Sequence, residues 1–136
     1  MKLAEIDLII KRLHILIILI RGDYLERERL IRVPKDEKAM RDYDYGIQKK
    51  EQMEEMILTE EQYEKLDKIG IFDRINEKCD IFIDEYEEEV LVLEKIPLAL
   101  EVVNQFINSN ESEELIQLNK MLNLAISYKT LVGFDF

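Results

Sequence analysis

The two ends of the chain carry apolar segments, and the helical patterns lie mostly between them. Residues 13–21 form an almost unbroken run of Ile and Leu, which is typical of a strand buried on both faces. Residues 130–136 form a second candidate strand, whose edge would promote aggregation unless it pairs within a sheet. We expect these segments to pair. The prediction is an α+β fold with a small sheet that includes the N- and C-terminal strands and packs against four to five helices.

The N-terminal region leaves two interpretations open. Apolar residues recur there at helical spacing, at Leu3, Ile6, Ile10 and Leu13. This spacing favours a short amphipathic helix ahead of the strand, but one helix over residues 3–20 fits as well. After Gly22 and Asp23, which indicate a turn, residues 24–33 are a further candidate strand that Pro34 ends.

The centre of the chain alternates between weak and strong helix signals. Residues 34–50 carry few apolar side chains and predict a long exposed loop. Thr59 and Gln62 match a capping box, which predicts the start of a helix that Gly70 ends. A second short helix is expected over residues 72–78.

The C-terminal half is expected to hold two longer helices. Residues 80–93 contain strand-forming residues split by an acidic stretch. Pro97 suits the first turn of a helix that runs to about Asn108. Asn110, with Glu113 three residues on, is the predicted cap of a last helix. Its apolar stripe comprises Leu115, Leu118, Leu122 and Ile126.

The size and composition predict one domain, residues 1–136. A hydrophobic fraction of 47% suffices for a core, and the single cysteine, Cys79, cannot form an internal disulfide. The apolar run at residues 15–20 is far shorter than the roughly 20 residues of a membrane span. Acidic residues at Glu5 and Asp7 do not suit a signal peptide. We therefore expect a cytoplasmic protein.

The charge of the chain is strongly acidic, at a net -11. Such a field repels nucleic acid and anionic membranes and accelerates encounters with basic proteins. Direct binding to DNA or RNA is therefore not expected, whereas imitation of nucleic acid stays open. The acidity is concentrated, because residues 51–136 hold 21 acidic and 7 basic side chains.

The densest acidic segment is residues 80–89, with six carboxylates and no base. Crowding like charges destabilises a fold, which favours a binding role in which a partner's cations neutralise them. The alternative is a solvated surface that serves solubility. The predicted partner-binding residues here are Asp80, Asp84, Glu85, Tyr86, Glu87, Glu88 and Glu89.

A second candidate contact region lies in the predicted loop. Tyr43 and Tyr45 alternate there with Asp42 and Asp44. Tyrosine is common at binding hot spots because it buries a rigid ring and offers a hydroxyl. The alternative is that these rings pack against the domain itself.

The residues that most enzymes and metal sites need are scarce. His14 is the only histidine and lies within an apolar run, and Cys79 has a negative neighbour, which does not favour a reactive thiolate. Two such residues cannot make a zinc site. Residues 42–53 begin like a calcium loop but place Gly46 one residue early and Met53 at the last ligand position. We expect no enzyme, metal site or cofactor.

In its size, its acidity and its lack of catalytic side chains, the chain resembles bacterial immunity proteins, the antidotes that are paired with toxins. The helix start at residues 58–66 and the closing stretch at residues 118–136 add to this resemblance. The resemblance implies that an acidic surface covers the basic active site of a toxin, for example a nuclease.

The predicted function is therefore that of a non-enzymatic acidic protein that neutralises a basic protein partner, which the resemblance implies to be a toxin domain. The alternative is a structural or regulatory interaction module, which could assemble as a homo-oligomer through apolar surface such as the Ile-rich N-terminal element.

Overall fold

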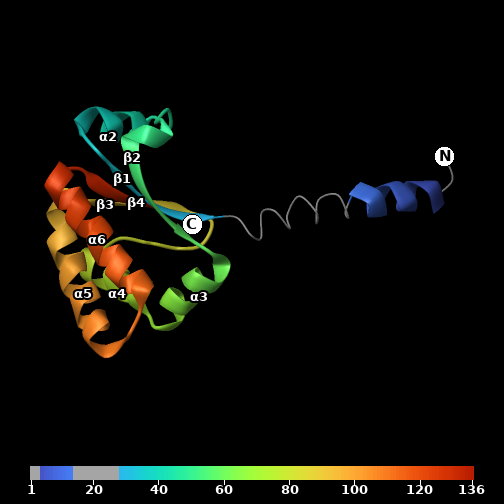
Figure 1. Ribbon diagram of the computed structural model, residues 1–136. Coiled ribbons are helices and arrows are strands. Elements are labelled where there is room, and N and C mark those ends of the chain that lie inside the picture. The colour runs from blue at the N-terminus through green and yellow to red at the C-terminus, as the bar shows by residue number, and fades with distance from the viewer. Residues whose placement is uncertain (1–3, 14–27) are drawn as a thin grey trace.

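The computed structural model describes residues 4–13 and 28–136, and it confirms an α+β fold (Figure 1). Residues 4–13 are helical, and all of them are exposed. The sheet has four strands in the order β2-β1-β4-β3, and every neighbouring pair is antiparallel. The C-terminal strand therefore occupies the centre of the sheet beside β1, which removes its exposed edge.

The elements follow one another along the chain with short connections. The strands are β1 (Arg29–Pro34), β2 (Met53–Leu58), β3 (Glu88–Val92) and β4 (Leu131–Asp135). The helices are α2 (Glu37–Asp44), α3 (Glu60–Lys68), α4 (Ile71–Cys79), α5 (Ile96–Ser109) and α6 (Glu113–Tyr128). Two short 3-10 helices, η1 (Lys50–Gln52) and η2 (Leu93–Lys95), precede β2 and α5.

The two faces of the sheet differ. Alternate residues such as Ile31, Leu91 and Phe134 are fully buried on one face. Helices α3 to α6 lie on this side in Figure 1 and complete the core with Leu66, Ile75 and other apolar side chains. The opposite face carries α2 over one of its ends (Figure 1).

Several helix predictions are confirmed. Thr59 and Gln62 form the capping box that starts α3, with the Thr59 hydroxyl accepting from the Gln62 amide at 3.2 Å. Gly70 follows that helix in the left-handed conformation, at φ 86°. Helix α4 covers the predicted residues 72–78, and Pro97 lies in the first turn of α5.

Two local predictions are wrong, and one strand was not predicted. Residues 34–50 are not a loop, because the Asp36 side chain accepts from the Ala39 amide at 2.7 Å and starts α2. Ser112, not Asn110, caps α6, with its hydroxyl accepting from the Leu115 amide at 3.2 Å. Residues 53–58, for which no strand was predicted, form the edge strand β2.

The predictions for the N-terminal region are settled only in part. The short amphipathic helix agrees with the helical residues 4–13, although Leu13 belongs to it and not to a strand. The candidate strand beyond Leu13, His14 and the turn at Gly22 lie outside the described residues. The C-terminal strand β4 pairs with β1, which contains the end of the predicted strand over residues 24–33, and on its other side with β3.

Candidate acidic interface

The acidic segment forms the loop between α4 and β3 together with the first residues of that strand. The side chain of Asn76 on α4 fixes the loop by accepting from the Ile83 amide at 2.6 Å and donating to the Ile83 carbonyl at 2.9 Å. Ile83 itself is buried in the core. Residues 84–88, which follow this anchor, are all exposed.

Part of this loop lines a pocket of about 220 Å³. Its walls come from distant parts of the chain: Glu28, Tyr86, Glu87, Glu88, Asp135 and Phe136. Glu88 and Asp135 are direct neighbours across β3 and β4, so their side chains lie on the same face of the sheet. Four acidic residues, from three strand ends and one loop, therefore line the pocket, and the Asp135 carboxylate among them is bound to Arg32 and Tyr43.

The carboxylates of the loop differ in what they bind. Glu89 accepts from the Phe82 amide at 2.8 Å and from its neighbour Val90 at 2.9 Å, so it holds the loop together. Asp84 accepts from the Glu85 amide at 2.8 Å. The side chains of Glu87 and Glu88 make no hydrogen bond or ion pair with any described residue. These two are the carboxylates most available to an external cation.

Arg29 joins the loop to α3. Its side chain, only 3% exposed, donates to both oxygens of Glu60 at 2.9 and 3.0 Å and to Glu85 at 3.5 Å. It also donates to the Phe136 carbonyl at 3.4 Å and stacks on the Tyr63 ring at 3.9 Å. Burial lowers the pKa of Arg29, but the hydrogen bond and charge of Glu60 outweigh burial and raise it.

The acidic surface continues from the loop onto α3. Burial, followed by the charges of Asp67 and Glu85, raises the pKa of Tyr63 to about 12. Arg29 holds Glu60 of α3 and Glu85 of the loop at the same guanidinium group, and both carboxylates stay partly exposed, so α3 and the loop present one acidic region. We call this region, together with the pocket, the acidic interface.

The second candidate region lies at the end of α2, and the structure gives its four residues different environments. Tyr43 lies half-buried against the sheet, and its hydroxyl donates to Asp135 at 3.1 Å. Burial and the charge of Asp135 raise its pKa above the ordinary value. Asp42 binds Lys38 at 2.7 Å and Gln52 at 2.9 Å, which lowers its pKa. Asp44 and Tyr45 are exposed.

Of the predicted loop residues, Tyr86, Glu87 and Glu88 meet at the pocket, whereas Asp80 does not line it. Asp80 is the C-terminal cap of α4 and is exposed. Glu28 and Asp135 were not among the residues predicted from the sequence. The alternation of the terminal strand could have placed Asp135 opposite the apolar face, but its proximity to Glu88 depends on the strand order.

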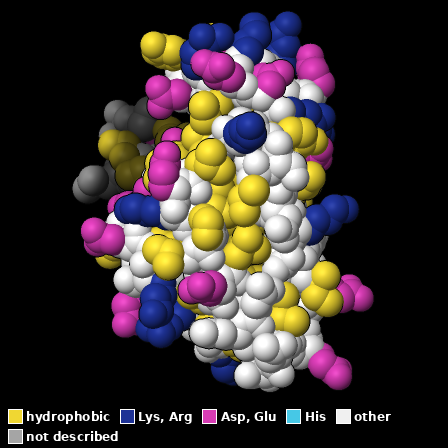
Figure 2. Space-filling model, turned by 90° about the vertical axis from the view of Figure 1, so that its left-hand side faces the viewer, with side chains coloured by type: hydrophobic (Ala, Val, Ile, Leu, Met, Phe, Trp, Pro, Cys, Tyr) yellow, Lys and Arg dark blue, Asp and Glu magenta, His cyan; other side chains and the backbone are white. Residues whose placement is uncertain are grey.

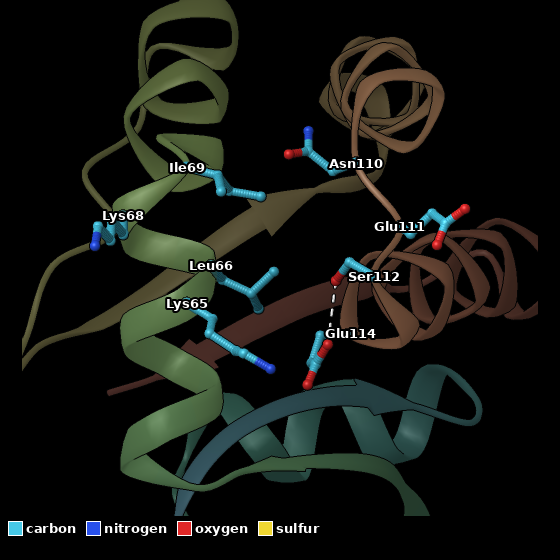
Figure 3. A pocket seen from close by; sticks show the side chains of 8 residues that line it. All are labelled: Lys65, Leu66, Lys68, Ile69, Asn110, Glu111, Ser112 and Glu114. Atoms are coloured by element: carbon cyan, nitrogen blue, oxygen red, sulfur yellow. Dashed lines mark hydrogen bonds between the residues drawn. The ribbon is translucent and has the colours of Figure 1, made fainter.

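A second pocket, of about 240 Å³, lies between α3 and the start of α6 (Figure 3). Lys65 and Lys68 come from α3, and Glu111 and Glu114 come from the other wall. In Figure 3, Lys65 points toward Glu114 across the pocket, whereas Lys68 points away. Since both signs of charge line it, this pocket does not select for a cation or an anion.

The face formed by α5 and α6 has another character (Figure 2). Apolar side chains run down its middle, and charged side chains stand singly, mostly toward its margins. Leu98 and Ile116 are among the exposed apolar residues of these helices. The crowded carboxylates therefore do not extend to this face.

Residues 4–13 and 28–136 were also compared with what metal binding, thiol chemistry and membrane insertion require. No group of three or more His, Cys, Asp or Glu side chains there could hold a metal ion. Cys79 is buried, and burial raises the pKa of its thiol. No helix in these ranges combines the length and the apolar character needed to span a bilayer.

Comparison with known proteins adds one finding about the fold. No protein-family model matches the chain, and no curated protein sequence matches it. The structure is similar to that of the Neisseria DNA mimic protein DMP12, with a TM-score of 0.53 and 19% sequence identity. The match covers 79% of this chain and 99% of that one. The chain thus shares its fold with a bacterial DNA mimic protein.

Proposed function

We propose that this chain is a non-enzymatic binding protein whose acidic interface occupies the nucleic-acid-binding surface of a basic protein. The observation that carries the proposal is the pocket lined by Glu28, Glu87, Glu88 and Asp135, in which the side chains of Glu87 and Glu88 make no hydrogen bond or ion pair with the described residues. Such a site suits the Lys and Arg side chains with which proteins contact phosphates.

The electrostatics of the interface support this partner chemistry. Exposed carboxylates held on a fixed backbone can replace phosphates as acceptors for guanidinium groups. Tyr86 and Glu87, both exposed, line the same pocket and would lie within the contact surface. The fold similarity to DMP12 points the same way, because a DNA mimic binds proteins that accept DNA.

An immunity protein that covers a nuclease toxin would be one instance of this class. The surface of a nuclease that such an immunity protein covers is also basic and also binds nucleic acid. The same acidic interface could therefore bind it. The identity of the captured partner separates this instance from a mimic that regulates a DNA-binding protein.

The test is a competition experiment. The chain is used to isolate its partner from the native host, and the purified partner is then titrated with the chain in the presence and absence of duplex DNA. We expect DNA to displace the chain. We also expect the double variant Glu87→Lys and Glu88→Lys to weaken binding by about tenfold or more at low salt, mainly through slower association.

A matched control carries the same change of charge elsewhere. Glu101 on α5 and Glu113 on α6 are both exposed, and their replacement by Lys should leave affinity within about twofold. A partner that binds DNA and the chain simultaneously would overturn the proposal. If both double variants weakened the affinity for the partner equally, the effect would be one of net charge and would not locate the interface.

A further inference from the structure

One large apolar side chain of the acidic loop is left in water. Phe82 is 64% exposed, whereas the other four phenylalanines of the chain are buried or half-buried. The next residue along the loop, Ile83, is buried in the core. An exposed ring forgoes the favourable free energy that its burial would contribute to folding. Phe82 therefore adds little to the fold, and its surroundings indicate what else it does.

The backbone that carries this ring is held on both sides. The Phe82 amide donates to the Glu89 carboxylate at 2.8 Å. The side chain of Asn76 binds both the amide and the carbonyl of Ile83, and the Asn76 carbonyl accepts from the Ile81 amide at 3.3 Å. Three successive amides of the loop thus have partners. A side chain on a backbone that is already ordered loses less conformational freedom when another protein covers it.

Carboxylates flank Phe82 along the loop. Asp80 and Asp84, two residues to either side of it, are both exposed. Tyr86 is a second exposed aromatic residue of the same loop, and it lines the pocket with Glu87. The loop therefore combines exposed aromatic side chains with exposed carboxylates. Aromatic residues are enriched at the centres of protein interfaces, and charged residues are typical of their rims.

This combination restricts the kind of partner surface that the loop fits. On a surface that accepts nucleic acid, carboxylates can take the positions of phosphates. A phenyl ring has no counterpart in the sugar and phosphate backbone, but it resembles the flat face of a base. Within a duplex these faces are stacked on one another. Proteins stack on them only where bases are unpaired or flipped out, using aromatic side chains or Arg guanidinium planes.

We propose that Phe82 is the apolar anchor of the acidic interface and that its ring occupies the site of an unstacked base on the partner. The partner is then a protein that binds single-stranded nucleic acid or a flipped-out base, with cations beside an aromatic or guanidinium platform. This inference rests on the proposed function, because it assigns the class of the same basic partner and an apolar contact to an interface otherwise defined by charge.

Variants of the full chain test the anchor against the partner that the wild-type chain isolates. We expect Phe82→Ala to weaken binding by about tenfold or more, mainly through faster dissociation. The loss should be the same at about 50 mM and about 300 mM NaCl, whereas the loss caused by Lys at positions 87 and 88 should shrink with salt. Phe82→Leu, which stays apolar but has no ring to stack, should weaken binding nearly as much as Phe82→Ala.

The matched control removes an equally exposed apolar side chain elsewhere. Ile116 on α6 is 60% exposed, and Ile116→Ala should leave the affinity within about twofold of the wild-type value. Because both positions are exposed, thermal unfolding should show the melting temperatures of all variants within about 2 °C of the wild-type chain.

Competing oligonucleotides identify the site that the ring occupies. The complex is titrated with oligo(dT) of about 12 nucleotides, with an abasic strand of the same number of phosphates, and with a duplex of the same length. We expect oligo(dT) to displace the wild-type chain at about tenfold lower concentration than the abasic strand, because only oligo(dT) offers bases to stack. The duplex should also compete less well than oligo(dT), since its bases are stacked on one another.

The outcomes separate this inference from the proposed function. Wild-type affinity of Phe82→Ala or Phe82→Leu, together with weak binding of the variant with Lys at positions 87 and 88, would overturn the base site and leave the proposed function standing. Equal displacement by oligo(dT) and the abasic strand would have the same meaning. If none of the three nucleic acids displaces the chain, both proposals fail.

Discussion

Arg29 shows how one buried cation can shape an acidic surface. Its contacts with Glu60, Glu85 and the Phe136 carbonyl tie α3, the acidic loop and the end of β4 to β1. Glu60 and Glu85 keep 40% and 44% of their side chains exposed, so each still faces water while Arg29 fixes its position. The cation therefore orders part of the acidic surface without being displayed on it.

The variant Arg29→Met tests this role. Met fills a similar volume over Tyr63 but cannot bind the two carboxylates, so we expect a loss of about 1–3 kcal/mol in the free energy of unfolding. Urea titration of both proteins measures it. Glu60→Gln, which keeps a hydrogen-bond acceptor, is the control and should cost less. Unchanged stability of Arg29→Met would show that the buried cation contributes nothing net.

Gly133 is a second residue at which one contact matters, because the Tyr43 side chain leaves no room there for a Cβ atom. Because an added Cβ would lie 2.0 Å from the Tyr43 hydroxyl, Gly133→Ala must displace the ring that α2 rests on. We expect a loss of about 1–3 kcal/mol, measured by thermal unfolding. The double variant with Tyr43→Ala removes the clash and should recover part of this loss beyond the sum of the two single effects. Strict additivity would contradict the assigned contact.

At the scale of elements, sequence patterns succeeded where the signal is local. The capping box of α3, Pro97 in α5 and the apolar stripe of α6 each act within a few residues, and all three helices formed. In α6, however, Ser112 and not Asn110 is the cap, and Ile126 of the predicted stripe is 38% exposed. Helix α2 was missed because its anchors are distant: Tyr43 packs on Gly133 and binds Asp135. Composition alone shows no apolar stripe there.

The acidic interface was predictable only in part for the same reason. The sequence located Tyr86, Glu87 and Glu88, since they are crowded in one segment. It could not supply Glu28 and Asp135, because they meet that segment only through the pairing of β4 with β3 and β1. A charge cluster in the sequence identifies one wall of a site, and the strand order supplies the others.

The loop that carries these acids depends on Asn76 in α4. Its side chain binds both the amide and the carbonyl of Ile83, so Asn76→Ala leaves two backbone groups without their partner. We expect faster amide hydrogen exchange across residues 81–88 and little change in α5 and α6. A uniform increase over the whole chain would indicate global destabilisation instead, and unchanged exchange would show that Asn76 does not hold the loop.

For the molecule as a whole, the excess of negative charge acts in opposite directions on folding and on binding. In the free chain, crowded carboxylates such as Glu87 and Glu88 repel one another, and added salt screens this repulsion. In the complex the same carboxylates attract the partner, and salt screens that attraction. The buried side chain of Arg29 is screened less, so its ion pairs change little over the same range.

We therefore expect the melting temperature of the free chain to rise by about 2–4 °C between about 10 mM and about 300 mM NaCl at neutral pH. The affinity for the partner should fall over the same range. Calorimetry and titration on one protein sample measure both quantities. The double variant with Lys at positions 87 and 88 should show a smaller rise in melting temperature, because the substitutions have already removed part of the repulsion. A melting temperature that falls with salt would mean that ion pairs such as Arg32–Asp135 outweigh the repulsion between carboxylates.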